Sequence, residues 1–352
     1  MSRKEFIVGL DIGTTKTCCV VAEVDSQSSD VDIIGVGLCP SKGVRKGVVV
    51  DLEDTTDAIM TSVEKARNMC GNVLIKTVVV GVTGEHISSL NSKGVIAITN
   101  PDKEISSSDV DRVIDASKVI VLPPDREIIH SIPRDYIVDG QDGVRDPVGM
   151  SGARLEVETH LVTGSVTFLD NVLKCVQRAN LAVDMTVFEP IATSEAALIQ
   201  AEKELGVALV DIGGGTTDIA VFTDGEVIYT AVIAVGGNHV TNDISVGLRT
   251  SYEESERVKI EYGYCMPGLS SDDATFEVMS LGADEPRELP CQILFDIIEP
   301  RMQEILSMAK EEIIKSGCIE ILPGGVVLTG GGSQIPGAIS MAEDIFQMPA
   351  RL

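Results

Sequence analysis

One short pattern occurs twice in the chain: an apolar run, an aspartate, a turn rich in glycine and threonine, and a second apolar run. The first copy has apolar runs at 6–10 and 18–24, with the turn at 11–16 between them. The second has apolar runs at 207–210 and 219–222, with the turn at 211–218. Internal repeats decide architecture more than single elements do. We therefore predict a duplicated strand–turn–strand design and two similar lobes.

The composition supports sheets covered by helices. Of the 352 residues, 44% are hydrophobic but only 3% are aromatic, so the core must consist mainly of Val, Ile, Leu and Ala. Mixed or parallel sheets under helices suit such a composition. Apolar spacing predicts a strand over 76–82 and helices over 58–70, 167–179, 252–262 and 292–315, with Pro300 kinking or splitting the last.

The length also indicates more than one unit, because a single core rarely organises so many residues. Two regions read as insertions into the repeated core, 84–162 and 228–290. We expect the first lobe core to comprise 1–83 with 163–194 and 335–352, and the second to comprise 195–227 with 291–334.

The charge balance excludes several classes of partner. The formal net charge is −26, from 54 acidic and 28 basic residues, and such a field repels nucleic acid and anionic lipid. A polyanionic ligand must then be held by local backbone N–H groups and a metal ion; otherwise the charge only aids solubility. The eight cysteines form no C-x-x-C pair, and the four histidines show no ligand spacing, so we expect no zinc and a reduced cytoplasmic chain.

The first turn offers groups that bind phosphate. Gly13 lets the backbone approach an anion, and Thr14 and Thr15 supply hydroxyl and N–H donors. Asp11, where the strand ends, is placed to orient water on Mg²⁺. Lys16 either neutralises terminal phosphate charge or points to solvent. Alone, this turn is equally compatible with an ordinary hairpin.

The second turn removes much of that ambiguity. It reads Asp211, Ile212, Gly213, Gly214, Gly215, Thr216, Thr217 and Asp218. Three consecutive glycines cost roughly 0.5–1 kcal/mol each relative to Ala in a regular element, and a hairpin needs at most two. A ligand pressing on the backbone is the better explanation, with Asp211 as a second residue that orients metal-bound water.

Two further glycine clusters precede predicted helices. Residues 326–329 form an apolar strand that leads into Gly330, Gly331, Gly332 and Ser333, and a short helix opens at Ile335. A strand, a glycine turn and a helix N-terminus together form either a nucleotide-binding site or a tight connection between a strand and a helix. Gly236, Gly237 and Asn238, ahead of His239, form a weaker element of the same kind. The phosphate loop G-x-x-x-x-G-K-[ST] and the dinucleotide fingerprint are both absent.

These motifs together resemble the phosphate and adenosine motifs of the actin-like ATPase superfamily. The resemblance implies an α/β fold with two lobes, duplicated mixed-sheet cores and inserted subdomains. Glu189-Pro190, before a helix predicted at 191–201, is similar to the superfamily motif whose acid positions the attacking water. Glu256 to Lys259 is similar to the helix that contacts adenosine. ATP with Mg²⁺ would lie between the loops, with Asp11 and Asp211 toward the metal and Asp11, Glu189 and Asp211 as catalytic residues.

Within the superfamily, three further segments resemble the FtsA family of bacterial division proteins. They are Gly-Val-Ile-Ala-Ile at 94–98, Asp-Arg-Glu-Ile-Ile-His-Ser-Ile-Pro at 125–133, and Asp-Pro-Val-Gly-Met-Ser-Gly-Ala-Arg-Leu-Glu at 146–156. The resemblance implies a polymerising cytoskeletal adaptor at the cytoplasmic face of the inner membrane at the division site. It implies binding to the FtsZ C-terminal tail through the second insertion, for which we select Arg301, exposed after Pro300, as a contact.

The same resemblance sets expectations about hydrolysis and the membrane. Turnover should be slow at most, with nucleotide state regulating assembly and downstream division proteins as further partners. Family chains continue past the position of Leu352 into a membrane helix, so we expect membrane contact only through a C-terminal helix absent from these residues.

Three other classes of protein are alternatives to this one. A small-molecule kinase needs an acceptor pocket with its own acid–base residue, and no His or carboxylate cluster outside the loops supplies one. A chaperone ATPase needs a substrate-binding domain after the core. The nearest alternative is the actin-like ATPase adaptor of type IV pilus assembly, which the segments at 125–156 disfavour.

Overall fold

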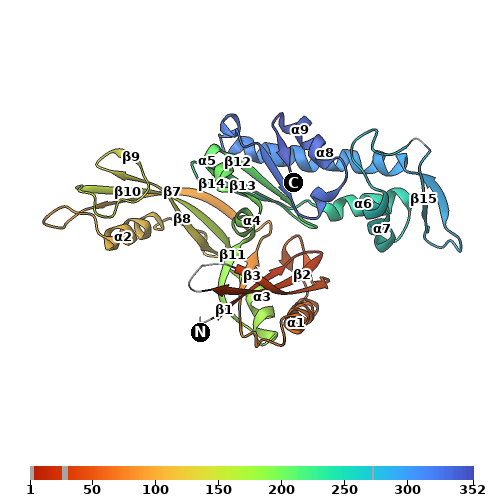
Figure 1. Ribbon diagram of the computed structural model, residues 1–352, viewed down its shortest axis with the longest axis horizontal. Coiled ribbons are helices and arrows are strands. Elements are labelled where there is room, and N and C mark those ends of the chain that lie inside the picture. The colour runs from red at the N-terminus through yellow and green to blue at the C-terminus, as the bar shows by residue number, and fades with distance from the viewer. Residues whose placement is uncertain (1–3, 26–30, 272) are drawn as a thin grey trace.

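The computed structural model describes residues 4–25, 31–271 and 273–352, and it has two lobes side by side (Figure 1). Each lobe contains a five-stranded mixed sheet. A four-stranded sheet with one helix projects from one end of the molecule, and two helices with a two-stranded sheet lie at the other end (Figure 1). The molecule is therefore elongated, with both sheet cores near its middle.

The first lobe has the strand order β11-β6-β1-β2-β3. Strand β1 pairs antiparallel with β2 and parallel with β6, while β2–β3 is antiparallel and β6–β11 is parallel. The elements are β1 (Lys4–Ile12), β2 (Lys16–Asp25), β3 (Val31–Pro40), β4 (Val44–Arg45), β5 (Val48–Val49), α1 (Leu52–Met69), β6 (Thr77–Val82), α3 (Val166–Arg178) and β11 (Ala182–Phe188).

The second lobe repeats this topology strand for strand, in the order β18-β17-β12-β13-β14. Strand β12 pairs antiparallel with β13 and parallel with β17, while β13–β14 is antiparallel and β17–β18 is parallel. The elements are α4 (Glu189–Ala197), α5 (Gln200–Leu205), β12 (Val207–Ile212), β13 (Thr217–Thr223), β14 (Glu226–Ile233), α8 (Gln292–Lys315), β17 (Val326–Thr329), α9 (Ala338–Phe346) and β18 (Ala350–Arg351). The predicted α/β fold with duplicated mixed-sheet cores is confirmed.

Two smaller groups of elements complete the chain. The projecting sheet has the order β7-β10-β8-β9, with β7 (Ser88–Ala97), α2 (Ser107–Ser117), β8 (Arg126–Val138), β9 (Gln141–Val144) and β10 (Arg154–Ser165). The group at the opposite end has α6 (Gly237–Leu248), α7 (Tyr252–Tyr262), β15 (Thr275–Val278) and β16 (Arg287–Pro290).

Several helix boundaries differ from the sequence predictions for identifiable reasons. Helix α1 begins at Leu52 rather than at 58, because the Asp51 side chain accepts hydrogen bonds from the N–H groups of Glu53 and Asp54. Helix α8 runs unbroken through Pro300, so the predicted split does not occur. A stripe of buried residues on both sides of Pro300 packs the whole helix onto the core, including Leu294, Ile298, Met302 and Ile305.

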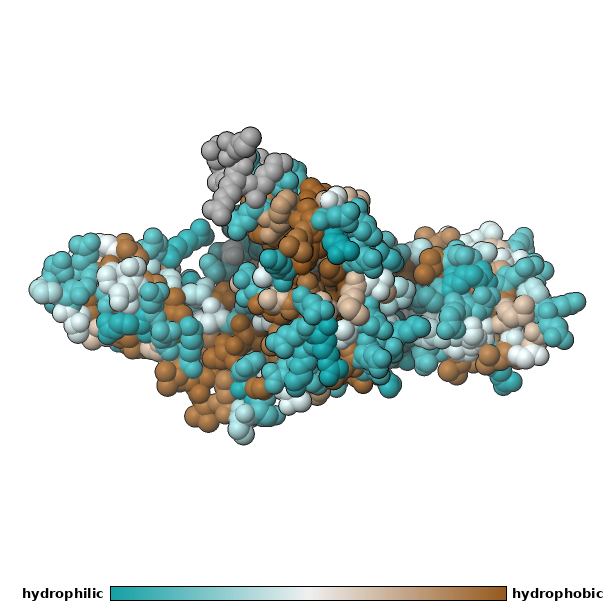
Figure 2. Space-filling model, turned by 90° about the horizontal axis from the view of Figure 1, so that it is seen from below, coloured by the Kyte–Doolittle hydropathy of each residue, from teal (hydrophilic) through white to brown (hydrophobic). Residues whose placement is uncertain are grey.

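The cores are built mainly from aliphatic side chains, as the composition predicted. Strand β1, however, is exposed where it begins: Val8 and Leu10 are inside, whereas Phe6, on the same face, and Ile7, on the other, are 43% and 49% exposed. Seen from below, hydrophobic side chains gather on the central part of the surface, and hydrophilic ones cover both ends (Figure 2). In the described ranges, no helix is long and apolar enough to cross a membrane.

Candidate functional site

The two repeated turns have the same backbone geometry. In the first hairpin Asp11 lies opposite Cys18, and in the second Asp211 lies opposite Asp218. The Gly13 N–H donates to the Lys16 carbonyl at 3.0 Å, and the Gly213 N–H donates to the Thr216 carbonyl at 2.9 Å. A Cβ on Gly13 would lie 2.9 Å from that Lys16 oxygen, so the turn itself already requires glycine there.

The next two glycines of the second turn let the lobes touch. A Cβ on Gly214 would lie 1.9 Å from Thr15 Oγ1, and one on Gly215 would lie 2.5 Å from Thr14 Oγ1. Thr15 Oγ1 also donates to Asn238 Oδ1 at 3.3 Å. The loops therefore face each other closely, and a side chain at either glycine would push them apart.

A cavity of about 640 Å³ opens between the loops, which is within the usual range for small-molecule sites. Most of the residues predicted to bind or act on a nucleotide line it. They are Asp11, Gly13, Thr14, Thr15, Lys16, Glu189, Asp211, Gly213, Gly214, Gly215, Thr216, Gly237, Asn238, Glu256, Lys259, Gly330, Gly331 and Gly332.

Three predicted nucleotide-binding residues do not line the cavity, and each has a structural task. The Thr217 hydroxyl donates to the Val235 carbonyl at 2.8 Å. The Ser333 hydroxyl donates to the Gly330 carbonyl at 2.7 Å and is almost fully buried. Gly236 packs under the second loop, where a Cβ would lie 2.5 Å from the Gly213 carbonyl oxygen. These residues hold the loops in place.

Four carboxyl groups line the cavity, those of Asp11, Glu189, Asp211 and Asp218, and the pKa of each is raised. Burial is the main cause in every case. The Asp11 pKa rises to about 6, with Asp211 adding to the effect and Lys16 opposing it. The Asp218 pKa rises to about 7. The pKa of Glu189 is raised well above its ordinary value by burial and then by the charges of Asp11, Asp218 and Asp211. The site thus concentrates negative charge where a polyanion was predicted to bind, an arrangement that requires cations.

Glu189 is the first residue of α4, two residues before the predicted helix start. Its side chain lies against Gly81 of β6, where a Cβ would be 3.1 Å from Glu189 Cγ. One turn further along α4, Thr193 Oγ1 donates to Asp211 Oδ2 at 3.2 Å, so α4 is joined directly to the second loop.

Sequence reasoning assigned no role to Asp218, Thr83 or Thr193, which all line the cavity. Asp218 accepts hydrogen bonds from the hydroxyls of Thr83 and Thr216. Thr83 follows strand β6, which is the topological equivalent of β17 before the third glycine cluster. The equivalence of β6 and β17 could have indicated that the residue after β6 faces the cavity. A single glycine follows Thr83, whereas three follow β17, so the similarity was hard to recognise in the sequence.

The third glycine cluster packs onto the second loop. Gly330 has a positive φ of 84°, and a Cβ there would lie 2.4 Å from Asp211 Oδ1. The following helix, α9, begins at Ala338 rather than at Ile335, because a 3₁₀ turn and Gly337 intervene. The helix N-terminus is therefore further along the chain than predicted.

The N-terminus of α6 supports the second loop. The N–H groups of Gly237 and Asn238 donate to the carbonyls of Gly213 and Gly214, both at 2.8 Å. These two donors are already used, so the predicted phosphate platform at α6 has less to offer an anion than its sequence indicated.

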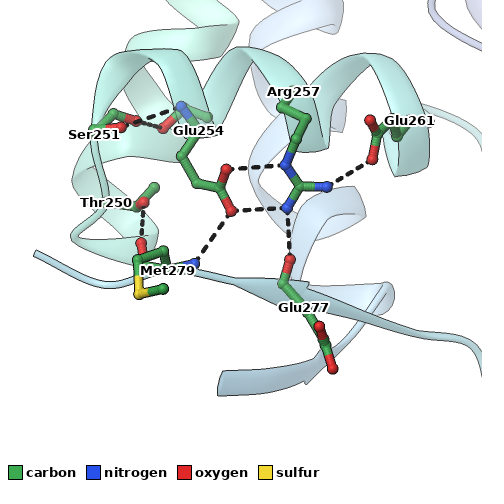
Figure 3. A network of polar contacts seen from close by, with 8 residues as sticks. Thr250, Ser251, Glu254, Arg257, Glu261, Glu277 and Met279 are labelled. Carbon is green, nitrogen blue, oxygen red and sulfur yellow. Dashed lines mark hydrogen bonds and ion pairs between the residues drawn. The ribbon is translucent and has the colours of Figure 1, made fainter. Parts of the chain in front are cut away.

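Helix α7 connects the cavity with the end of the molecule. Glu256 and Lys259 lie on its cavity side and form an ion pair at 2.7 Å. On another side, Glu254 and Arg257 bind each other and the backbone around β15 (Figure 3). Ser251 caps the helix by accepting a hydrogen bond from the Glu254 N–H, while the Glu254 side chain completes this second network.

The structure places Arg301 away from the cavity and not free in solvent. Its guanidinium forms ion pairs with Asp243 of α6, at 2.6 Å, and with Glu304, and its side chain is only 25% exposed. The expectation of an exposed arginine is wrong, because α6 supplies a carboxylate partner from 58 residues away.

The residues present fit Mg²⁺ bound through water and phosphate. Within residues 4–25, 31–271 and 273–352, no three His, Cys, Asp or Glu side chains could hold a metal ion by themselves. Mg²⁺ usually keeps several waters and takes one or two carboxylates plus substrate phosphates. Asp11 and Asp211, at equivalent strand ends beside the cavity, suit that mode.

Comparisons of sequence point to one family. A family model described as "Cell division protein FtsA" matches residues 208–352, and one described as "SHS2 domain inserted in FTSA" matches 84–163. The chain is 44% identical to "Cell division protein FtsA" of Pseudomonas aeruginosa, over 99% of this chain and 82% of the relative. It is 44% identical to the Bacillus subtilis protein of that name, over 100% and 79% of the two chains. The identity with the Escherichia coli K12 protein is 37%, over 99% and 84%.

Comparisons of structure give the fold. A "PilM-PilN type IV pilus biogenesis complex" matches with a TM-score of 0.69 at 17% identity, over 98% of this chain and 87% of that chain. MreB5 of Spiroplasma citri bound to ADP matches with a TM-score of 0.58 at 15% identity, over 99% and 91%. At such low identities these matches show the fold alone, which is that of the actin-like ATPases.

Proposed function

This chain belongs to the FtsA family of cell division proteins, and from that premise we propose that it binds ATP with Mg²⁺ between its lobes and assembles into filaments at the division site. The actin-like fold implies nucleotide binding. One observation carries the finer proposal: two hairpins of the same register and turn geometry face each other across a cavity of about 640 Å³.

Different groups of the chain would bind the phosphates and the metal ion. Thr14, Thr15 and Thr216 line the cavity, and Gly214 lets the two loops approach closely. The Thr14 hydroxyl accepts a hydrogen bond from the Gly47 N–H, so its own proton would be donated to a phosphate oxygen. Thr15 and Thr216 donate to Asn238 and Asp218, and they would turn to phosphate by giving up those bonds. Bound Mg²⁺ would supply the positive charge that the surrounding carboxylates require, with Asp11 and Asp211 holding its waters.

Hydrolysis is proposed as a slow, secondary activity. Glu189, beside Asp211 at the start of α4, would accept a hydrogen bond from the attacking water and align it. Burial raises its pKa, as do the neighbouring carboxylates, and nearby positive charge would favour the ionised form. We propose that the nucleotide state regulates assembly and that turnover serves no metabolic flux.

We also propose a role for each insertion of the chain. The insertion at 84–162 would carry filament contacts, and the insertion at 228–290 with α8 would bind the FtsZ C-terminal tail. The first lobe core would comprise 1–83 with 163–194, and the second 195–227 with 291–334. The expected place of 335–352 in the first lobe is wrong, because β18 pairs with β17 in the second-lobe sheet and α9 packs into the same core. A contact through Arg301 would have to replace its ion pairs with Asp243 and Glu304.

Location at the cytoplasmic face of the inner membrane is part of the same proposal. The family is one of cell division proteins, and the net charge of −26 opposes direct attraction to anionic lipid. The type IV pilus adaptor, our alternative from the sequence, is a structural neighbour only, and the family matches favour division.

The test separates binding from hydrolysis. A Glu189→Ala variant should bind ATP within a few-fold of the parent chain but hydrolyse it at least about tenfold more slowly, because a water-aligning acid acts in the transition state. Equilibrium binding of a fluorescent ATP analogue and single-turnover phosphate release measure the two effects. Asp184→Ala, on the exposed side of β11 leading to Glu189, is the matched control. Hydrolysis at the parent rate in folded Glu189→Ala would remove Glu189 from the mechanism.

A further inference from the structure

A histidine of the projecting sheet binds the backbone directly before Glu189. The Phe188 N–H donates a hydrogen bond of 2.9 Å to His130 Nε2. Phe188 is the N-cap residue of α4, and its side chain offers no cap. His130 belongs to the segment at 125–133, which the nucleotide motifs do not explain. The contact therefore joins an unexplained motif to the residue that precedes the proposed acid.

The local backbone of β8 is adapted to this contact. Its register with β10 shifts at Ile129, next to His130, which marks a β-bulge. Bulges re-aim side chains and are over-represented near active sites. Two residues along the strand, Ile132 packs against the cluster that contains Leu198, and Ile191 of α4 packs against the same cluster. Strand β8 is thus seated on α4 by packing as well as by the hydrogen bond.

The chemistry of His130 suits an acceptor. Partial burial lowers the pKa of its imidazole, so the ring is neutral near pH 7. With Nε2 accepting, the ring proton is on Nδ1. A partly buried, neutral acceptor holds the Phe188 amide in one place without adding charge to a site already crowded with carboxylates.

Glu189 has little freedom on its other side. A Cβ on Gly81 would lie 3.1 Å from Glu189 Cγ and 3.3 Å from its Oε1, so the side chain already rests on bare backbone of β6. A shift of α4 would therefore move the Glu189 carboxyl relative to Asp11 and Asp211, with no space toward β6 to compensate.

We propose that His130 is a positioning residue for Glu189, through which the β7-β10-β8-β9 sheet sets the geometry of the hydrolytic acid. This proposal rests on the proposed role of Glu189 in aligning water. A displacement of about 1 Å at such a group costs up to about a hundredfold in rate, so a single backbone hydrogen bond is enough to matter. The sheet would then govern hydrolysis without touching the nucleotide.

The experiment compares two replacements of one side chain in the full chain. His130→Leu removes the acceptor, whereas His130→Gln keeps an oxygen that can accept from the Phe188 N–H. We expect His130→Leu to bind ATP within about twofold of the parent but to hydrolyse it about tenfold more slowly. His130→Gln should restore most of the rate. Ser131→Ala, next along β8 with a hydroxyl that has no hydrogen-bond partner in the structure, should behave as the parent chain.

A spectroscopic readout covers the case in which turnover is too slow to measure. The chemical shift of the Glu189 carboxyl carbon, followed by NMR in selectively labelled protein at one fixed pH, reports the surroundings of this group. We expect that shift to change in His130→Leu, because the carboxyl moves relative to β6, and to stay near the parent value in His130→Gln. If His130→Leu does not fold, His130→Asn, whose shorter amide cannot reach the Phe188 N–H, replaces it.

The outcomes separate this inference from the proposed function. If Glu189→Ala slows hydrolysis while folded His130→Leu retains both the parent rate and the parent chemical shift of the Glu189 carboxyl carbon, the positioning role is refuted and the proposed function stands. If Glu189→Ala itself hydrolyses at the parent rate, the proposed role of Glu189 in hydrolysis is refuted, and the positioning role of His130 is refuted with it. Equal loss in His130→Leu and His130→Gln would also refute the inference, since the acceptor would not be what matters.

Discussion

Replacing Gly214 tests whether the two loops must approach each other to hold a nucleotide. The Cβ of an alanine there would lie 1.9 Å from Thr15 Oγ1 and 3.2 Å from Asn238 Oδ1, whereas ordinary contact begins at 3.4 Å. Thr15 must therefore retreat by roughly 1.5 Å. The backbone at Gly214 is not in the left-handed region, so crowding between the lobes is the only direct effect.

The size of the effect follows from what is lost. The hydrogen bond from Thr15 to Asn238 contributes about 1 kcal/mol, and the displaced hydroxyl no longer reaches a phosphate. Together these predict ATP affinity at least about tenfold weaker for Gly214→Ala, since a factor of ten is about 1.4 kcal/mol. Gly214→Val, with a branched side chain between the loops, should abolish measurable binding. The free energy of unfolding without nucleotide should change by about 1 kcal/mol or less.

Isothermal titration with ATP and Mg²⁺ measures the affinity, and urea denaturation measures the stability. Gly9→Ala is the matched control, because a Cβ at this β1 glycine, two residues before Asp11, meets nothing within 4 Å. It should bind ATP as the parent chain does. A folded Gly214→Val chain with unchanged ATP affinity would refute the reasoning that the nucleotide lies between the two loops.

Four further predictions use other parts of the molecule. Burial raises the pKa of Asp218 to about 7 from its ordinary 3.8, so the folded chain holds a proton that the unfolded chain has released, and stability falls as pH rises through about 4 to 7. Asp218→Asn should therefore lose less thermal stability than the parent chain between about pH 5.5 and 7.5; equal losses would contradict this. Arg257→Ala should lower the free energy of unfolding by about 1 kcal/mol, because it releases the β15 backbone and Glu254; an unchanged urea midpoint would argue against that network. Arg301→Glu should weaken binding of an FtsZ-tail peptide about fivefold at low salt, measured by fluorescence anisotropy; unchanged affinity would exclude the contact. The chain alone, with its net charge of −26, should stay in the supernatant with anionic liposomes and sediment once a basic amphipathic helix is appended after Leu352; sedimentation of the unmodified chain would place a membrane contact within these residues.

Much of the candidate site could be predicted because each of its loops is a short, contiguous sequence motif. A close backbone approach needs glycine, and a strand that ends beside a phosphate needs a polar residue. The spacing in the sequence was therefore enough to predict Asp11, Gly13, Asp211 and Gly214 as site residues. The duplication was visible for the same reason, since each hairpin is a contiguous segment. The whole strand order of the second lobe then repeats that of the first.

Other features depended on partners distant in the chain. Thr83 and Asp218 are 135 residues apart and hydrogen-bonded, and nothing in either local sequence indicates it. Arg301 looked exposed from helical spacing, but packing of α8 on α6 brought Asp243 beside it. Thr217 belongs to a phosphate-binding motif by sequence, yet its hydroxyl reaches the Val235 carbonyl.

The amino-acid sequence alone determined which backbone segments can turn tightly, which faces are apolar, and that the phosphate-loop pattern occurs twice. These are properties of neighbouring residues, and spacing along the chain expresses them. Only the tertiary structure decided which polar groups are left to face the cavity, because hydrogen-bond partners and burial are set by how sheets and helices pack. His130 shows the difference: its motif was visible from the sequence, but its hydrogen bond to the amide before Glu189 exists only because β8 is seated on α4.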